Sequence, residues 1–361
     1  MPRSLSMRVL IICLCWLGLL GCSEPVLAKS SASIAVLQYH HIGDDTPRVT
    51  SVTADELAQH IEWLQEHDFD IVSITDALQL LQQPTPATAK LAVLTIDDGW
   101  KNVYQNGLPV FKKYQVPFTV FVNPRLMREA PNLYMNWQQL RELQQYGATI
   151  ANHTNSHDHL TWRRTDESES QWQQRIRADI LDAQQEIDEA LGAQPKLLAY
   201  PYGEYDPAVE AIVEEAGFVA FAQHSGAWNR FSNSAAIPRF PASAQYADLR
   251  TLATKINSLA LPVTQITPAS MVLKHDQSTP SFSVTLDHTD DFNPAQMNCF
   301  AGSSTLRPSW QGNTFTVELS QPLPIGRSRV NCTVASKSQP QRFYWYSQPF
   351  ARADKNGRWP D

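Results

Sequence analysis

The stretch Leu91-Ala92-Val93-Leu94-Thr95-Ile96-Asp97-Asp98-Gly99 decides the fold class of this chain. Its first part is apolar toward both faces, which is typical of a strand inside a parallel sheet that is covered on both sides. Two adjacent carboxylates and a glycine then end the strand. Ligands bind at the carboxyl ends of parallel strands, so the stretch predicts a sheet with a site at its edge. A simple turn is the alternative, because Asp-Gly is also a common loop signal.

Strand-like and helix-like segments alternate on both sides of this stretch, from Ser33 to about Leu259. The capping box Thr53-Ala54-Asp55-Glu56 predicts the start of a helix that ends near Phe69, and apolar spacing predicts another helix over residues 170–191. Alternating strands and helices imply a parallel sheet, which over this many repeats can stay open or close into a barrel. Further strands are expected at 34–39, 70–72, 116–122, 148–151, 196–200 and 218–222.

The pattern changes after about Leu261. Apolar and polar residues alternate at 282–286, 315–319 and 330–334, and breaks rich in Pro, Gly and Asn separate these segments. Alternation with a period of two predicts antiparallel strands with one buried face. We therefore expect an α/β domain over residues 33–261 and a small all-β, sandwich-like domain over 266–361. The aromatic residues Tyr344, Trp345 and Tyr346 of this second domain form either a glycan-stacking surface or part of its core.

The N-terminus has the layout of an export signal, which we assign to residues 1–28. Two arginines and no acid occur in the first eight residues, an uncharged run follows to Leu20, and small residues come next. The run is shorter than the roughly 20 apolar residues that span a bilayer. Cleavage before Cys22, which lies in a lipobox-like sequence, predicts a lipoprotein anchored through Cys22. Cleavage after Ala28 predicts a soluble exported protein. Both place the chain outside the cytoplasm, in the periplasm or on the outer membrane facing it.

Cysteine usage and charge agree with an exported protein that does not bind nucleic acid. Beyond the export segment only Cys299 and Cys332 remain, and an even pair in an oxidising compartment predicts a disulfide, with two buried thiols as the alternative. Because Cys332 shares a strand face with Val330 and Val334, we expect the bond to cross the core. The formal net charge of −7, without a basic run, argues against nucleic-acid binding.

Two further polar clusters follow predicted strands. In Asn152-His153-Thr154-Asn155-Ser156-His157 the two histidines are four residues apart and can direct their rings at one point. Two imidazole nitrogens and a carboxylate oxygen make a three-ligand set suited to zinc, with a position left open for water; a chance histidine pair is the alternative. His159 is expected to point away. The turn Tyr200-Pro201-Tyr202-Gly203 exposes amide groups that can donate to an oxyanion.

Taken in this order, the motifs resemble the polysaccharide deacetylase family, the carbohydrate esterases with a NodB-homology domain. The resemblance covers roughly residues 33–261 and rests on Thr95-Ile96-Asp97-Asp98-Gly99, His153-Thr154-Asn155-Ser156-His157 and Tyr200-Pro201-Tyr202-Gly203. It implies a distorted (β/α) barrel whose site lies at the carboxyl ends of the strands. It also implies hydrolysis of N-acetyl groups from an N-acetylglucosamine-containing polysaccharide, with release of acetate.

The resemblance also implies roles for individual residues. Asp98, His153 and His157 match the family's metal ligands, and the divalent metal is expected to be Zn²⁺. Asp97 matches the general base that takes a proton from water. The backbone N–H of Tyr202 matches the group that stabilises the oxyanion together with the metal.

Two positions depart from the family pattern. Many members carry an arginine that holds the catalytic aspartate, and here that position is Ala199. We expect Arg239 to replace it, although a surface arginine in a proline-rich loop is an equal alternative. The general acid is either His40 or His224. The Tyr-His start and the Ala-Tyr-Pro-Tyr-Gly form of the third motif resemble exported poly-N-acetylglucosamine deacetylases, in which an early histidine acts as the acid, and this favours His40.

Other readings of the same residues are a glycosidase, a decayed glycan-binding protein of the cell envelope, and a deacetylase of peptidoglycan or chitin oligosaccharides. A glycosidase needs two carboxyl groups about 5 Å or more apart across a sugar bond, whereas Asp97 and Asp98 are neighbours. Complete metal ligands argue against a decayed site. His41 is interpreted as a neighbour of His40, and His60 as a solvated helix residue.

Overall fold

The computed structural model describes residues 31–360. The export segment, Cys22 and both cleavage sites therefore lie outside the described residues. Within residues 31–360, no helix is both long enough and apolar enough to cross a membrane.

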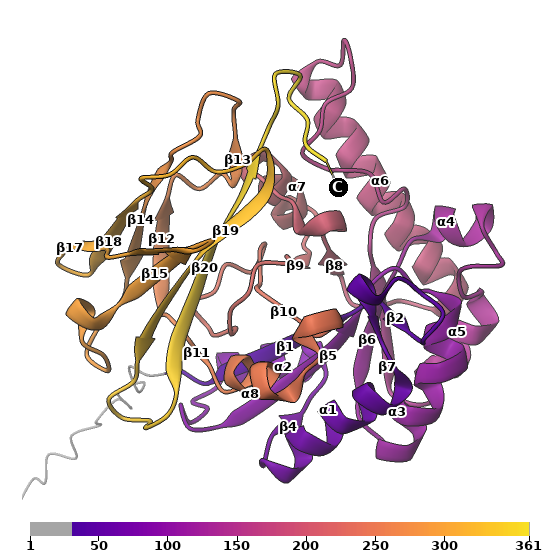
Figure 1. Ribbon diagram of the computed structural model, residues 1–361. Coiled ribbons are helices and arrows are strands. Elements are labelled where there is room, and N and C mark those ends of the chain that lie inside the picture. The colour runs from indigo at the N-terminus through magenta and orange to yellow at the C-terminus, as the bar shows by residue number, and fades with distance from the viewer. Residues whose placement is uncertain (1–30, 361) are drawn as a thin grey trace, which may run out of the picture.

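Parallel strands form the centre of the first domain (Figure 1). They run in the spatial order β10, β1, β5, β6, β7, β8, β9. A short strand, β4, pairs with the N-terminal part of β5. Their bounds are β1 (Ser33–Tyr39), β4 (Asp70–Ile71), β5 (Lys90–Ile96), β6 (Phe118–Val122), β7 (Ala148–Asn152), β8 (Leu197–Ala199), β9 (Val219–Phe221) and β10 (Phe240–Pro241). Because β5 and its neighbours are covered on both faces, all but one of the β5 residues are buried.

The segment 237–241 closes this sheet into a distorted barrel. Ile237 pairs in parallel with Phe221 of β9, and Phe240 pairs in parallel with Leu37 of β1. The last strand is thereby joined to the first through residues that the sequence pattern did not indicate as a strand. Arg239 lies between these two pairings, inside the closed ring.

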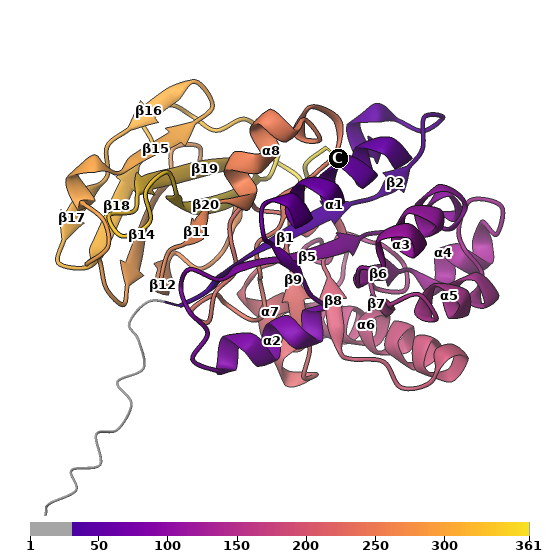
Figure 2. The same ribbon diagram turned by 90° about the horizontal axis from the view of Figure 1, so that it is seen from below.

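Helices cover the barrel from outside (Figures 1 and 2). The predicted capping box starts α1, since the Thr53 hydroxyl accepts from the Glu56 N–H and the Glu56 carboxylate accepts from the Thr53 N–H. The predicted apolar stripe of α6 is buried. The helices are α1 (Ala54–Glu66), α2 (Ile74–Gln82), α3 (Leu108–Tyr114), α4 (Pro124–Glu129), α5 (Trp137–Gln144), α6 (Glu169–Leu191), α7 (Pro207–Glu215) and α8 (Leu249–Ile256).

The expectation of a solvated His60 is wrong. Its ring is buried, with Nδ1 3.1 Å from the Tyr39 hydroxyl and Nε2 2.6 Å from the Ala247 carbonyl oxygen. Residues 57, 60, 61 and 64 follow the spacing of one helix face, and this face of α1 packs on the barrel. His60 therefore belongs to the buried stripe.

The second domain is a β-sandwich, as the alternating pattern predicted. One sheet runs β11, β20, β19, β15, β16, with β13 paired to β20, and the other runs β12, β14, β18, β17. Their buried faces meet in one apolar core. The strands are β11 (Leu259–Ala260), β12 (Val263–Thr267), β13 (Val272–Leu273), β14 (Ser281–Leu286), β15 (Asn298–Ala301), β16 (Ser304–Leu306), β17 (Ser309–Gln311), β18 (Thr314–Glu318), β19 (Gly326–Ala335) and β20 (Phe343–Arg352).

The sandwich packs beside the barrel through its larger sheet (Figure 2). Strand β11, which lies in the range assigned to the α/β domain, pairs in parallel with β20 of this sheet. The three aromatic residues of β20 divide between two packing surfaces: Trp345 packs on the barrel core, and Tyr344 and Tyr346 pack on the sandwich core. They are half-buried and do not form a common stacking surface.

Cys299 and Cys332 are joined by a disulfide, so the free-thiol alternative is excluded. The two residues lie opposite each other in register on β15 and β19, which are adjacent strands of one sheet. The bond faces the core but does not cross it, and this part of the expectation is wrong. The sequence showed which face Cys332 occupies, whereas the sheet to which Cys299 belongs depends on strand pairing.

Candidate metal centre

The site begins where β5 ends. Asp97 and Asp98 follow directly after the strand, and Asp98 has a left-handed backbone with φ 72°. Gly99 continues this conformation at φ 72°, and a Cβ atom there would lie 2.9 Å from Val122 Cγ1. Only glycine fits this position without a shift of β6. The turn therefore separates the two carboxylates: Asp97 lies inside the barrel, and Asp98 lies at its mouth.

Asp98, His153 and His157 converge at this mouth. The Asp98 Oδ1 atom lies 3.2 Å from His153 Nε2 and 3.3 Å from His157 Nε2. One ligand atom from each residue lies within 4.8 Å of the others. His153 follows β7, and the backbone at Thr154 and His157 is left-handed, which returns the second imidazole to the same point.

The surroundings of this triad fit a divalent cation. His153 Nδ1 lies 2.7 Å from the Ala199 carbonyl oxygen, which leaves Nε2 as the ligand atom; such a backbone contact is the usual partner of a metal-binding histidine. The Asp98 Oδ1 atom is buried and has no hydrogen-bond partner among the described residues. Burial would raise the pKa of Asp98, but the His153 and His157 imidazoles hold it well below its ordinary value. Two nitrogens and one carboxylate oxygen suit Zn²⁺ with an open fourth position.

Trp100 holds the other oxygen of Asp98. Its indole Nε1 donates a 2.8 Å hydrogen bond to Asp98 Oδ2, and its ring packs against His41 at 4.4 Å and Tyr134 at 4.5 Å between ring centroids. The aspartate is thereby oriented with Oδ1 toward the histidines. Sequence reasoning missed this role, because no spacing rule links a tryptophan to the carboxylate two residues before it.

Asp97 is fully buried and held from several directions. Arg239 donates from Nη1 to Oδ1 at 2.7 Å and from Nη2 to Oδ2 at 2.8 Å, and Gln38 Nε2 donates to Oδ2 at 2.8 Å. Burial would raise the pKa of Asp97, but the Arg239 guanidinium and the nearby His153 and His40 outweigh it and lower the pKa to about 2. Asp97 is therefore an ionised, oriented carboxylate at neutral pH.

The structure places Arg239 inside the barrel, and the surface-arginine alternative is wrong. Its side chain is fully buried, and it also donates from Nε to the Ala222 carbonyl oxygen at 2.9 Å and from Nη1 to the Thr95 hydroxyl at 3.2 Å. The barrel-closing segment directs the residue inward. Ala199, the position expected to carry arginine in the family, instead presents its carbonyl oxygen to His153.

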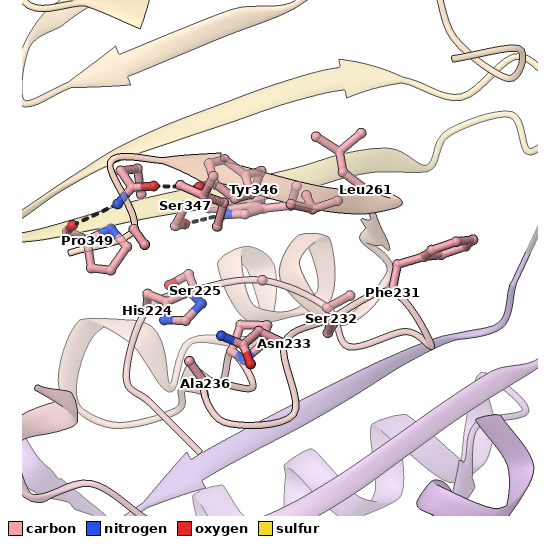
Figure 3. Close-up of a pocket in the computed structure, with 18 of the residues that line it drawn as sticks. His224, Ser225, Phe231, Ser232, Asn233, Ala236, Leu261, Tyr346, Ser347 and Pro349 are labelled. Atoms are coloured by element: carbon pink, nitrogen blue, oxygen red, sulfur yellow. Dashed lines mark hydrogen bonds between the residues drawn. The ribbon is translucent and has the colours of Figure 1, made fainter. Parts of the chain in front are cut away.

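The two candidate acids lie in different places. His40 follows β1, and its Nε2 atom lies 3.9 Å from Asp97 Oδ2. His224 follows β9 and lines a cavity of about 370 Å³ beside Tyr346, Ser347 and Pro349 of β20 (Figure 3). Of the described residues that line this cavity, none belongs to the metal triad, and Asp97 is also not among them. Burial lowers the pKa of His224 to about 4, so this imidazole is neutral near pH 7.

Tyr202 occupies the third motif in a left-handed conformation, with φ 59°. A Cβ atom at the next residue, Gly203, would lie 2.6 Å from the Gln223 backbone nitrogen, so the turn requires glycine. The Tyr202 ring packs edge-on against His157 at 4.8 Å and stacks on His159 at 4.0 Å between ring centroids. The turn is thus in direct contact with the triad, and His159 supports it without being a member of the metal-ligating group.

The sequence model of the polysaccharide deacetylase family matches residues 85–221, which include the metal triad, Asp97 and Tyr202. YxkH of Bacillus subtilis, named as a polysaccharide deacetylase, is 24% identical over 196 residues, which are 54% of this chain and 66% of YxkH. The poly-β-1,6-N-acetyl-D-glucosamine N-deacetylase of Escherichia coli K12 is 24% identical over 243 residues, which are 56% of this chain and 35% of that enzyme. The chain thus spans just under two thirds of the first relative and about one third of the second.

The fold has counterparts among solved structures. The Streptococcus pyogenes deacetylase PplD in complex with acetate superposes with a TM-score of 0.56 at 19% identity, over 63% of this chain and 99% of PplD. This similarity concerns the fold. The first domain thus shares its fold, a distorted (β/α) barrel, with this structure, and residues 85–221 within it match the polysaccharide deacetylase family model.

The contact between Trp100 and Asp98 predicts an effect on metal affinity. Trp100→Phe keeps the ring but removes the N–H that orients the carboxylate, so we expect the affinity for Zn²⁺ to fall by about tenfold, the usual effect of losing such a partner. Isothermal titration of metal-free protein with Zn²⁺ measures this change. Trp310→Phe is the matched control, because the Trp310 indole N–H has no hydrogen-bond partner among the described residues. Equal affinities of the two variants would contradict the assignment.

Proposed function

We propose that this chain is an exported, metal-dependent polysaccharide N-deacetylase, with poly-β-1,6-N-acetylglucosamine as the favoured substrate. The observation that carries the proposal is the pairing of two different carboxylates at one strand end. Asp98 faces two imidazoles, and Asp97 is held by Arg239 beside them. One carboxylate is thereby suited to bind a cation and the other to accept a proton. The relative from Escherichia coli supports the choice of substrate, because its name gives this polysaccharide as the molecule that it deacetylates.

The reaction is the hydrolysis of an amide that is not a peptide bond. When bound by Asp98, His153 and His157, a divalent cation, proposed to be Zn²⁺, supplies Lewis acidity toward carbonyl and water oxygens. Asp97 accepts a proton from the attacking water, and Arg239 and Gln38 keep its carboxylate in place for that transfer. The Tyr202 N–H donates to the oxyanion that develops on the acetyl carbonyl oxygen.

His40 is proposed as the general acid. When the carbon–nitrogen bond breaks, the sugar amine must gain a proton, and His40 lies on the Asp97 side of the site. The products are acetate and a glucosamine unit. His224 is less suited to this step, because it lines another cavity and its imidazole is neutral near pH 7.

The competing functions are less consistent with the same contacts. In a glycosidase, two carboxyl groups must flank a sugar bond at a separation of about 5 Å or more, whereas Asp97 and Asp98 are sequence neighbours and Asp98 faces two imidazoles. A glycan-binding site that has lost its catalytic activity does not require a buried carboxylate paired with an arginine, such as Asp97 with Arg239. Export, with either a lipid anchor at Cys22 or release after Ala28, remains part of the proposal, since a glycan substrate of the envelope lies outside the cytoplasm.

Acetate release from defined glycans tests the function. We expect the purified protein to release acetate from poly-β-1,6-N-acetylglucosamine, to lose this activity on complete metal removal, and to regain it with Zn²⁺. Chitin oligomers and peptidoglycan serve as comparison substrates. Asp97→Asn is expected to lower turnover at least about 100-fold, as the loss of a proton acceptor does. Activity that survives a chelator would defeat the mechanism.

Arg239 is expected to act through Asp97 and not through the metal. Arg239→Met leaves a buried carboxylate without its counter-charge, and such a change typically lowers the free energy of unfolding by about 3–5 kcal/mol. We therefore expect turnover to fall about 100-fold or more while the bound Zn²⁺ per chain stays constant in metal analysis. Arg230→Met is the control, because Arg230 is exposed. Unchanged turnover, or loss of metal, would show that Arg239 has another role.

The two histidines can be separated by substitution. His40→Gln is expected to lower turnover about 100-fold, in the range of general acid catalysis, whereas His224→Gln is expected to change it less than about threefold. Initial rates of acetate release at saturating substrate measure both variants. The reverse order of effects would assign the acid to His224.

A further inference from the structure

Glu204, two residues after Tyr202, is a fully buried carboxylate with partners from both domains. Its Oε2 atom lies 2.7 Å from His159 Nδ1 in the barrel domain. Its Oε1 atom accepts hydrogen bonds from Arg327 Nη1 on β19 at 3.0 Å and from Trp359 Nε1 near the C-terminus at 2.6 Å. Two of the three contacts are therefore supplied by residues beyond the barrel.

A buried carboxylate is costly unless it is paired and hydrogen-bonded. Within the barrel domain, the described contact of the Glu204 carboxylate is His159. The sandwich provides the cation, and the C-terminal segment provides a neutral donor. The position of Glu204 therefore depends on the sandwich and on the C-terminal segment, whose Trp359 belongs to one apolar cluster with residues of α6 and α7.

The same residues enclose the Tyr202 ring. His159 stacks on it at 4.0 Å with an interplanar angle of 9°, and the Arg327 guanidinium lies 5.4 Å from its centroid. On its other face, His159 stacks on Trp162 at 3.6 Å, and Trp359 packs edge-on against Trp162 at 5.5 Å. Because Tyr202 has a strained left-handed backbone, its conformation persists only if its surroundings hold it.

We propose that Arg327 and Trp359 are positioning residues of the deacetylase site, which act through Glu204 and His159 on the Tyr202 turn. The β-sandwich is then a structural part of the site and not a separate glycan-binding module. This inference rests on the proposed function, because the Tyr202 N–H is the group whose placement matters for the reaction. Misplacement of such a donor lowers turnover more than substrate binding.

Arg329 provides the matched comparison. It lies two residues after Arg327 on the same face of β19 and also contacts the barrel domain, where its Nη2 donates to the Tyr246 hydroxyl at 3.2 Å. Substitution of either arginine removes contact between the two domains. Of the two arginines, only Arg327 contacts Glu204 and the Tyr202 ring. A general weakening of the interface should therefore affect both variants, whereas a positioning effect should appear only in the Arg327 variant.

The experiment compares Arg327→Met, Arg327→Lys, Arg329→Met and Trp359→Phe in the full chain. We expect Arg327→Met to lower kcat about tenfold with KM changed less than about twofold, and Trp359→Phe to act in the same direction. Arg327→Lys keeps the positive charge and is expected to recover part of kcat. Arg329→Met is expected to retain wild-type kcat. In Glu204→Gln protein, Arg327→Met is expected to have less effect than it has alone, because the two residues act as one unit.

Hydrogen–deuterium exchange supplies a readout that does not depend on activity. Backbone amides of residues 200–206 are expected to exchange faster in Arg327→Met than in Arg329→Met, with bound Zn²⁺ equal in both. If the wild-type protein releases no acetate, the proposed function fails, and the exchange data alone decide the positioning role. Equal exchange over 200–206 in the two variants overturns the inference. Equal kcat in the two variants of an active enzyme also overturns it.

Discussion

The buried pair of Asp97 and Arg239 is the interaction on which the site and the barrel both depend. Both side chains are fully buried, and a charge of either sign is costly there unless its partner is in place. Arg239 also donates to the Ala222 carbonyl oxygen and the Thr95 hydroxyl, and these hydrogen bonds hold the guanidinium against Asp97. Because Asp97 follows β5 and Arg239 lies in the closing segment, the same ion pair connects closure of the barrel with orientation of the carboxylate.

Backbone strain is concentrated at the mouth of the barrel. Asp98, Thr154, His157 and Tyr202 all have positive φ, although none is glycine. Each such residue costs about 1–3 kcal/mol and persists only when its surroundings hold it. Here the triad, the Asp97 pair and the contacts around Glu204 are those surroundings. The same part of the barrel brings two imidazoles and a carboxylate to one point, with the Tyr202 ring packed against His157.

The sandwich is placed to support this arrangement. The inner face of its larger sheet packs on the sandwich core and carries the disulfide, while the outer face presents Arg327 and Arg329 to the barrel. A strand that alternates between two faces can therefore stabilise its own domain and reach the site of the other.

The sequence alone determined the local elements and the order of the motifs. Periodicity predicted the strands of the barrel except the closing segment 237–241, the α1 and α6 helices and the alternation in the sandwich, because the pattern of buried residues repeats within each element. The strand-end positions of Asp97, Asp98, His153 and Tyr202 follow from the same reasoning. Tertiary structure decided the contacts between distant positions: Arg239 with Asp97, 142 residues apart, and Trp359 with Glu204, 155 residues apart. It also decided the burial of His60 and the pairing of Cys299 with Cys332 within one sheet. Local periodicity states which face of an element is buried, but which residues meet there depends on how the chain closes the barrel and packs the sandwich against it.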